Sequence, residues 1–533
     1  MSIATPFSEW LPGMAITAGR LQYLLELALS GGTSISIAAY GAVGDGTTDD
    51  APAIQAALDA AYARGGGVVV FPPGQTYAIK TFLAVQDNVT ISAYGATIKS
   101  TGNTGLIRNF FSSETFNAYS GHSHIIVQGG TWDANAADGT TGTVVAETDA
   151  FNFIHCQDIT IRDVTIKNVS SAHAIEFNST DGGRVLNCRF LGYRDNSGTS
   201  ARQFSEAVQL DIAVSGSSSI GNFDSTTSRN ILVMGCYFGP SERCGVWGRA
   251  VGSHTARAAT FYDNVQIIGN RIDGTLQEGI RGFAWRRCVI ADNIITGTGY
   301  SGILLTVPDP ATYSVTTYGA AITGNVVQGA GTDSGIRVIA FSATPYSNVR
   351  IEGNVIEGSS TGANGIHTEQ CARPGISGNT IRSTGSTGIF ATGCLGPQIT
   401  GNGLRDIGTN GINITACTGG QVSTNTVDST STNHGVFITT STDVAVQSNV
   451  VRAAASAGVR CGATAVRTFV TGNSVRGGVN GVTFDATATG CIVAGNDLSG
   501  NSWSATTAIN ITSGAAPKTT WAAGTAVPGD NLI

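Results

Sequence analysis

The chain has 533 residues, a formal net charge of −7 at pH 7 and only 12% charged residues. With 71 glycines and no basic stretch, this composition suits a turn-rich β protein and excludes a general affinity for nucleic acid or anionic membranes. The 10 cysteines follow no metal-binding or disulfide spacing, so we expect reduced core thiols, no metal and no cofactor.

The N-terminal segment, residues 1–34, contains no charged stretch leading into an apolar run and nothing long enough to cross a bilayer. It therefore predicts neither a signal peptide nor membrane insertion. Leu21, Leu24, Leu25 and Leu29 fall on one stripe of a short amphipathic helix. Two interpretations stay open, a helix docked on the body of the protein and a segment for attachment or self-association.

Residues 37–80 contain a GDG turn, a helical stretch and a VFPPG strand and turn in succession. This order resembles the opening of the pectate-lyase-like right-handed parallel β-helix superfamily. Thr48 or Asp49 can N-cap the helix, whose apolar face would cover the open end of the first coil. We expect the clustered acids Asp45, Asp49 and Asp50 to be structural and not to bind calcium.

Residues 101–500 are predicted to form a β-solenoid. From Asn270 to Asn496, β-branched residues around a Gly-Asn pair, followed by a small residue, Gly and Ile or Val, recur about every 23 residues. This period is too short for a helical hairpin, and residue-by-residue alternation predicts parallel strands stacked about 4.8 Å apart. We expect the asparagines to stack through their amides, glycines to occupy positive-φ corners, and Cys371, Cys394 and Cys417 to form one interior column.

The coil pattern extends the resemblance to about residue 500, and the opening of the chain is most similar to bacteriophage tailspikes and polysaccharide depolymerases. The resemblance implies a homotrimer on the virion, made in the host cytoplasm and attached to a phage tail or baseplate through its N-terminal segment. It also implies a bacterial surface polysaccharide as partner, in the capsule, exopolysaccharide or O-antigen. The NTD, GHG and RIK set of polygalacturonases and the YGxDPH motif of mannuronan epimerases are absent, so pectate lyase or epimerase chemistry is not implied.

Two surface columns are predicted on the early coils. In each coil the residue after the Ile of the repeated phrase, and the residue two further on, should face outward. Early coils place acids, arginines and indoles there, whereas late coils place Thr and Asn. Three long insertions, at 192–203, 213–230 and 249–264, belong to the same early coils. We predict a glycan-binding groove there, with ladders of salt bridges as the alternative.

Glu176 and Asp211 are the predicted catalytic pair. If Gln209 stacks on Glu176, then Asp211 lies two residues along and one coil up, about 8 Å away between backbone positions. Carboxyl groups roughly 6.5–9.5 Å apart suit an inverting glycosidase, and a retaining or a lyase reaction stays open. Glu206 and Glu278 are alternates, with surface acids at strand starts as the other interpretation.

The predicted substrate-binding residues are aromatic, basic or polar side chains on or near these columns: Trp247, Arg249, Arg281, Phe283, Trp285, His254, Gln209 and Asp133. The aromatic rings would cover the apolar side of a sugar, with core burial or a trimer interface as the alternative. The arginines would hold an acidic sugar or, in a lyase, take a proton, unless they pair with Asp211 and Glu278. His173 and His254 are too isolated for a metal site and are interpreted as a strand and a loop residue, with acid–base catalysis as the alternative.

Residues 501–533 lose the Gly-Asn rhythm, which predicts a last coil and a C-terminal cap. The predicted division is therefore an N-terminal segment at 1–34, a cap with the first coil at 35–100, the substrate-binding solenoid at 101–500 and this tail. A virion depolymerase is the preferred function. The alternatives are a cellular or secreted β-helix lyase or hydrolase and a non-catalytic glycan-binding solenoid.

Overall fold

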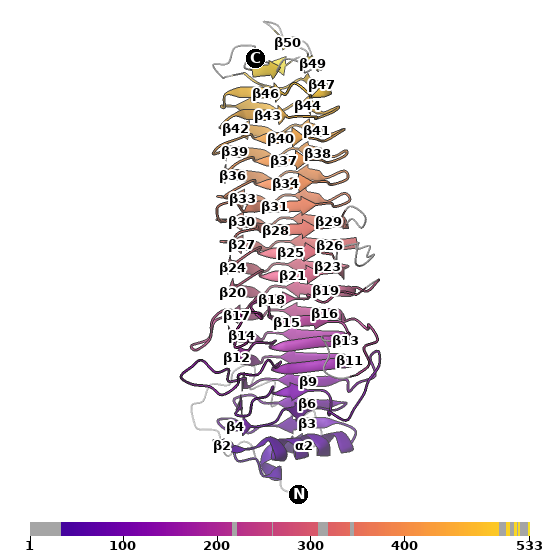
Figure 1. Ribbon diagram of the computed structural model, residues 1–533, viewed down its shortest axis with the longest axis vertical. Coiled ribbons are helices and arrows are strands. Elements are labelled where there is room, and N and C mark those ends of the chain that lie inside the picture. Colours follow the sequence, from indigo (N-terminus) through magenta and orange to yellow (C-terminus); the bar gives the residue numbers. More distant parts are fainter. Residues whose placement is uncertain are drawn as a thin grey trace.

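The computed structural model describes residues 34–215, 221–257, 259–307, 318–341 and 346–499, with short pieces at 508–511, 516–519, 521–522 and 531–532. Over these residues the chain is a right-handed parallel β-helix (Figure 1), which confirms the all-β fold class predicted from the repeat. The predicted helix around Leu21–Leu29 lies outside the described residues.

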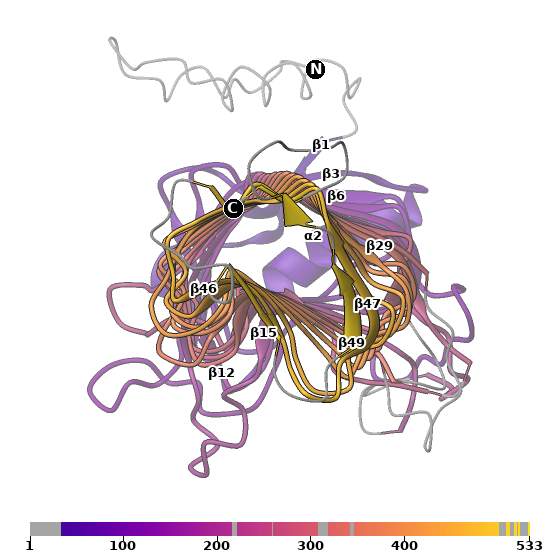
Figure 2. The same cartoon turned by 90° about the horizontal axis from the view of Figure 1, so that it is seen from above.

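Each coil contributes three strands. In one late coil these are β34 (Ile389–Thr392), β35 (Gln398–Thr400) and β36 (Gly403–Ile407), and each pairs in parallel with its counterpart three strands later. We call the stacks that contain β34, β35 and β36 the first, second and third walls. The third wall is a 16-stranded sheet, whereas the first and second walls together form a 33-stranded sheet. Seen along the axis, the coils superpose around one interior (Figure 2), which is filled by buried apolar side chains.

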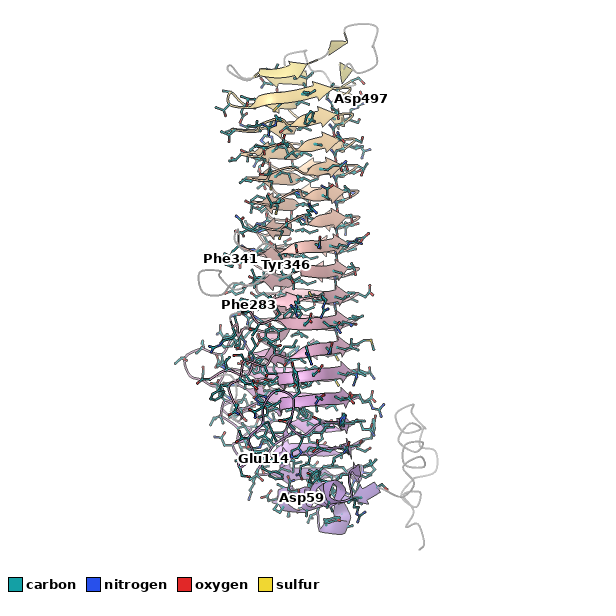
Figure 3. All side chains as sticks on the ribbon, turned by 90° about the vertical axis from the view of Figure 1, so that its right-hand side faces the viewer. Asp59, Glu114, Phe283, Phe341, Tyr346 and Asp497 are labelled. Carbon is teal, nitrogen blue, oxygen red and sulfur yellow. The ribbon has the colours of Figure 1, made fainter. Side chains whose placement is uncertain are left out.

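The first wall of the early coils holds the residues of interest. Its strands there are β8 (Ile107–Arg108), β11 (Phe151–Arg162), β13 (Ile175–Leu186), β15 (Glu206–Asp211), β18 (Arg249–Gly252) and β21 (Ile280–Phe283). β11 and β13 are 12 residues long because they continue past the corner into the second wall, where they pair with β9 (Ile125–Gln128) and β16 (Arg229–Met234). Long loops project from one side of these coils, whereas the later coils are regular (Figure 3).

The asparagine ladder is present as predicted. From Asn270 to Asn496, each buried Nδ2 donates to the Oδ1 of the asparagine one coil later at 2.9–3.0 Å. The preceding glycines, such as Gly401, have positive φ, which lets the chain turn into the third wall. The ladder satisfies buried polar groups between coils and therefore fixes their register.

The glycines that precede Ile or Val in the repeated phrase, such as Gly388 and Gly411, do not have positive φ, so the predicted reason for glycine does not apply to them. A Cβ on Gly388 would lie 2.7 Å from the carbonyl oxygen of Gly411 in the next coil. Glycine is needed here for close packing between coils. Cys371, Cys394 and Cys417 stack in the interior, where Cys394 N–H donates to Cys417 Sγ at 3.3 Å, and all 10 cysteines are free and buried.

The N-terminal end is closed by β1 (Ser34–Ser36), the 3-10 helix η2 (Ile37–Tyr40) and α2 (Ala51–Ala63), whose apolar face lies on the core. The N-cap is Asp50, so the prediction of Thr48 or Asp49 is wrong by one or two residues. The Asp50 carboxylate instead accepts the N–H groups of Val43 and Gly44, and Asp45 accepts those of Thr47 and Thr48. These contacts confirm a structural role for the acids.

At the other end, β48 (Ile509–Ile511) and β49 (Ala516–Thr519) pair with β46 (Asn480–Phe484) and β47 (Thr489–Ala494). The strand ladder thus continues beyond residue 500. No helix among the described residues is long and apolar enough to span a membrane.

Candidate functional site

One column of side chains on the first wall is set by strand register. Arg108 pairs with Asn152, Asn152 with Glu176, and Glu176 with Gln209, on successive coils. Two residues along the same strands, Asn178 pairs with Asp211. The predicted register between Glu176 and Asp211 is therefore correct, and their backbones are about 8 Å apart.

Glu176, Asn178, Gln209 and Asp211 form a square on two adjacent strands. The two carboxylates lie at opposite corners, and the two amides lie at the other two corners. On β13, Asn178 Nδ2 donates to Glu176 Oε1 at 3.0 Å. On β15, Gln209 Nε2 donates to Asp211 Oδ2 at 2.9 Å, and the Ile212 N–H donates to Asp211 Oδ1 at 2.7 Å. Each carboxylate is thus oriented by an amide of its own strand, which fixes the direction in which the acid faces.

Three residues of this square, Glu176, Gln209 and Asp211, line a cleft of about 790 Å³. All three predicted insertions contribute to it, through Arg202, through Val214 and Ser215, and through His254 and Thr255. Earlier segments of the chain also line the cleft: Phe82, Thr104, Gly105, Arg108, Phe110, Glu147, Thr148 and Asp149. The cleft therefore lies on the early coils, as predicted, but extends further toward the N-terminus.

Glu176 belongs to a group of carboxylates held close together. Asn152 Nδ2 donates to Glu176 Oε2 at 2.9 Å and to Asp149 Oδ2 at 2.8 Å, so one amide joins the two acids. Burial raises the pKa of Glu176 well above its ordinary value, and the charges of Asp149 and Asp211 and a hydrogen bond to Asp149 add to the rise. Glu176 is therefore suited to carry a proton at neutral pH.

Asp211 is also perturbed. It is 2% exposed, and burial raises its pKa to about 7, against the opposing effects of His254, Thr255 and the Ile212 N–H. Two acids in one cleft, both protonated more readily than usual, form an arrangement that can donate and accept protons near neutral pH.

Glu206 and Glu278, the predicted alternates, lie beneath the cleft and do not line it. Arg249 joins them, with Nη1 at 3.0 Å from Glu206 and Nε at 2.6 Å from Glu278. His254 Nδ1 lies 3.2 Å from Glu206, which is fully buried. Although burial opposes ionisation, His254, Arg249 and His173 lower the pKa of Glu206. The structure therefore does not support the predicted catalytic role of Glu206 and Glu278 or the predicted substrate contact of Arg249. All three are buried outside the cleft lining, in an ionic cluster in contact with His254.

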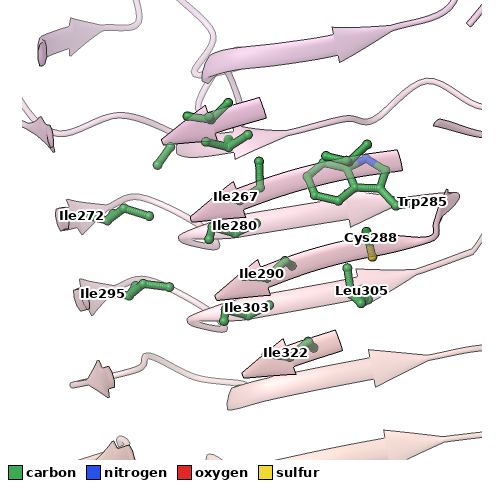
Figure 4. Close-up of a cluster of buried hydrophobic side chains, with 14 of the residues drawn as sticks. Ile267, Ile272, Ile280, Trp285, Cys288, Ile290, Ile295, Ile303, Leu305 and Ile322 are labelled. Carbon is green, nitrogen blue, oxygen red and sulfur yellow. The ribbon is translucent and has the colours of Figure 1, made fainter. Parts of the chain in front are cut away.

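Trp247 and Trp285 were expected to present their rings outward, and this is wrong. Both are 0% exposed. Trp247 stacks on Tyr193 and donates to the carbonyl of Phe190, and Trp285 donates to Ser253 Oγ inside the core (Figure 4). Core burial, the alternative considered for these residues, is what the structure shows.

The error at Trp247 is one of register. Its coil contains two similar phrases, Gly245-Val246 and Ala250-Val251, and the first-wall strand β18 uses the second. Gln209 consequently pairs with Gly252, and Trp247 bridges to Thr275 instead. The position two residues after Gly252 is His254, which lines the cleft with its side chain 26% exposed.

The remaining predicted residues lie in different places. Gln209 and His254 line the cleft together, with their Nε2 atoms 3.4 Å apart. Arg281 stacks over Phe283 one coil beyond β18, outside the lining residues. Asp133 is wrong as a substrate residue, because it lies on β10 (Thr131–Asp133) of the third wall and accepts hydrogen bonds from Asn135 and Asn168.

Residues that sequence reasoning missed include Arg108, Asp149, Asn152 and Arg202. Arg108 and Asn152 occupy the predicted outward column, but their coils precede the recognisable phrases. Asp149 follows a loop with no repeat. His173, interpreted as a strand residue, lines the cleft and lies 3.6 Å from Glu206, and burial lowers its pKa. No group of three or more possible metal ligands occurs among the residues that the structure describes.

Two family models match the chain. One, described as rhamnogalacturonase A/epimerase, pectate lyase-like, matches residues 34–247, and the other, described as a right handed beta helix region, matches residues 314–498. The chain is a right-handed parallel β-helix, and its residues 34–247 match a pectate-lyase-like family. The first match contains all four acids and amides of the square.

This β-helix has relatives of different kinds. It is 32% identical over 269 residues to plasmin and fibronectin-binding protein A of Streptococcus pneumoniae, covering 47% of this chain and 37% of that protein. It is 37% identical over 145 residues to mannuronan C5-epimerase AlgE1 of Azotobacter vinelandii, covering 24% of this chain and 10% of that protein. The chain therefore spans well under half the length of these relatives.

Solved structures share the fold. The surface adhesin PfbA of Streptococcus pneumoniae has a TM-score of 0.58 at 24% identity, over 68% of this chain and 89% of that one. A tailspike protein of E. coli bacteriophage HK620, in complex with a pentasaccharide, has a TM-score of 0.50 at 12% identity, over 95% of this chain and 81% of that one. Parallel β-helices of adhesins and tailspikes are thus both similar to this chain in architecture.

Proposed function

We propose that this β-helix binds a bacterial surface polysaccharide in the cleft and hydrolyses its glycosidic bonds, with Glu176 as proton donor and Asp211 as base. The observation that carries the proposal is a pair of buried acids with raised pKa values on adjacent coils of a cleft. Such acids destabilise a fold at neutral pH, so two of them side by side in a cleft favour a chemical role over a structural one.

The geometry supports inversion. Glu176 gives its proton to the glycosidic oxygen, and that oxygen leaves with the bonding electron pair as an alcohol. Water attacks the anomeric carbon from the opposite face while Asp211 takes its proton. The diagonal placement, about 8 Å between backbones, leaves room for this water. Asp149, joined to Glu176 through Asn152, supports the protonated form of Glu176.

We place this activity on a phage virion, in a homotrimer attached to the tail or baseplate through residues 1–34 and acting at the bacterial surface. Support comes from the likeness of fold to a tailspike and from the cleft on the early coils. Light scattering of the purified protein should give three times the chain mass. Removal of residues 1–34 should leave this mass and the glycan cleavage unchanged while abolishing incorporation into particles.

A second candidate is an adhesin that binds without cleavage, because a relative in sequence and in fold is a surface adhesin. In that case plasmin or fibronectin would bind the protein, and acids in the cleft would not be needed.

The test is product analysis on a panel of capsular and exopolysaccharides, by reducing-end assay and ultraviolet absorbance together. Glu176→Gln and Asp211→Asn keep the shape of each side chain, and Glu352→Gln, an exposed acid on β29 (Ser347–Glu352), is the matched control. New reducing ends lost in both cleft variants, but not in the control, support hydrolysis. Absorbance at the new ends would show a lyase, and binding of fibronectin without glycan cleavage would favour the adhesin.

A further inference from the structure

Arg108 is a charged side chain in the cleft without a counter-ion. It lies at the end of β8, half-buried, with its guanidinium stacked against the rings of Phe82 and Phe110. Burial lowers its pKa to about 10. Nη2 donates to Ser112 Oγ at 2.9 Å, whereas Nε is buried without a hydrogen-bond partner. No carboxylate among the described residues forms an ion pair with it.

The nearby carboxylates are already engaged. Glu147 Oε1 lies 3.0 Å from Arg202 Nε, so this carboxylate is paired with another arginine. Asp149 accepts hydrogen bonds from Asn152 Nδ2 and from the N–H of His173, at 2.8 and 3.1 Å. The fold therefore holds Arg108 by aromatic stacking, which leaves its N–H edge available to a ligand.

The position of Arg108 relates it to the acids. It pairs with Asn152, which pairs with Glu176, so it lies two coils, or about 10 Å, from the proton donor along one column. Asn152 Oδ1 between them is also buried without a partner. A polar column with one positive charge, that of Arg108, thus continues from the acids toward the N-terminal end of the cleft.

We propose that Arg108 binds an anionic substituent, a carboxylate or sulfate, on a sugar unit beside the bond that is cleaved, and so selects acidic over neutral polysaccharides. This inference rests on the proposed function, because it assumes that the cleft holds a glycan. A guanidinium presents paired donors that match a planar carboxylate, and partial burial strengthens the contact.

The test is glycan binding in a Glu176→Gln background, which prevents cleavage. An array carries acidic and neutral bacterial polysaccharides, with each acidic one also in its carboxyl-reduced form. Arg108→Gln removes the positive charge. Arg108→Lys keeps the charge but lacks the planar, paired N–H donors of the guanidinium. Arg189→Gln is the matched control, because Arg189 is exposed on β14 (Arg189–Arg194) of the third wall, stacked on Tyr237 outside the cleft.

We expect binding to acidic glycans that falls about ten- to hundredfold on carboxyl reduction or in Arg108→Gln, with Arg108→Lys intermediate and Arg189→Gln unchanged. Binding that survives carboxyl reduction but is lost in Arg108→Gln identifies a sulfate if desulfation of the glycan also abolishes it, and overturns the inference if desulfation has no effect. Equal binding of reduced forms and undiminished binding by Arg108→Gln would overturn the inference.

Failure of this inference can be told apart from failure of the proposed function. Cleavage of neutral glycans by the wild-type protein would refute the proposed role of Arg108 but would support the proposed hydrolase function. Absence of glycan binding by every variant would overturn both. Arg108→Gln loses the stacking on Phe82 and Phe110, so its thermal midpoint is measured beside its binding. A midpoint well above the assay temperature shows that a fall in binding is not due to unfolding.

Discussion

The substitution Asp211→Asn should stabilise the protein at pH 8 and leave its stability unchanged at pH 4. The Asp211 carboxyl is buried, and its pKa rises from 3.8 to about 7 in the folded chain. Below pH 4 the folded and unfolded states both hold the proton. Between pH 4 and 7 the unfolded state loses it first, so wild-type stability falls as the pH rises, and above pH 7 the loss is complete.

The magnitude follows from the size of the shift. About three pKa units at 1.36 kcal/mol each give about 4 kcal/mol lost by the wild type between pH 4 and pH 8. Asparagine carries no charge and avoids this loss. It can still accept the Ile212 N–H, and rotation of the Gln209 amide lets Gln209 Oε1 accept from its Nδ2. For cooperative unfolding of about 500 residues, 4 kcal/mol corresponds to a rise of about 4 °C in thermal midpoint.

The measurement is the difference in thermal midpoint between variant and wild type across pH 4–8. Asp138→Asn is a control whose expected effect on stability above pH 4 has the opposite sign. Hydrogen bonds from Thr141 and Thr140 lower the pKa of Asp138, so its ionised form stabilises the fold above pH 4 and the variant should lose stability there. A difference for Asp211→Asn that is the same at pH 4 and pH 8 would refute the reasoning, because the carboxylate would then carry no burial penalty.

Four other predictions follow from the same contacts. Glycan cleavage should rise with pH through about 7, as Asp211 ionises, and fall at higher pH as Glu176 loses its proton; a rate independent of pH from 5 to 9 would exclude this pair. Glu206→Gln should lower the free energy of unfolding by about 3–5 kcal/mol, measured in urea, because Arg249 loses a buried partner, whereas Glu352→Gln should change it little. Asn402→Ala should cost about 2–4 kcal/mol by breaking the ladder to Asn379 and Asn425, against no measurable loss for the exposed Asn433→Ala. Trp247→Phe should reduce the thermal midpoint but not glycan affinity, and a selective loss of affinity would restore Trp247 to the substrate site.

The fold and half of the site could be predicted from the sequence because a solenoid repeats its register. Once Glu176 is aligned with Gln209, the place of Asp211 follows from strand geometry alone. The same logic failed at Trp247, where one coil contains two similar phrases and only packing decides which forms β18. The prediction that the indole rings face outward was wrong as well. An indole on a strand can point inward when the backbone turns just before that strand begins.

The N-terminal side of the cleft could not be predicted for a different reason. Asp149 and Arg202 reach the site from loops, and no periodicity places a loop residue next to a strand. Arg108 and Asn152 do lie in the column, but the loops between their strands vary in length. Their alignment with Glu176 is visible only once the pairing of β8 with β11 is known.

The late coil of β37 (Ile412–Thr415) carries uncharged side chains at the first-wall positions where the early coils carry the two acids. Asn413 and Thr415 occupy the positions that Gln209 and Asp211 occupy earlier, and Thr415 Oγ1 donates to Asn413 Oδ1 at 3.1 Å across the same two-residue separation. An uncharged pair can therefore form the same hydrogen bond along the strand without burying a charge. The early coils depart from it by placing one carboxylate in each of two adjacent pairs, by adding Asp149 beside Glu176, and by surrounding these acids with loops. Because the strand pairing is the same in both regions, these departures come from the side chains and loops, and they are the reason for proposing that any chemistry takes place on the early coils.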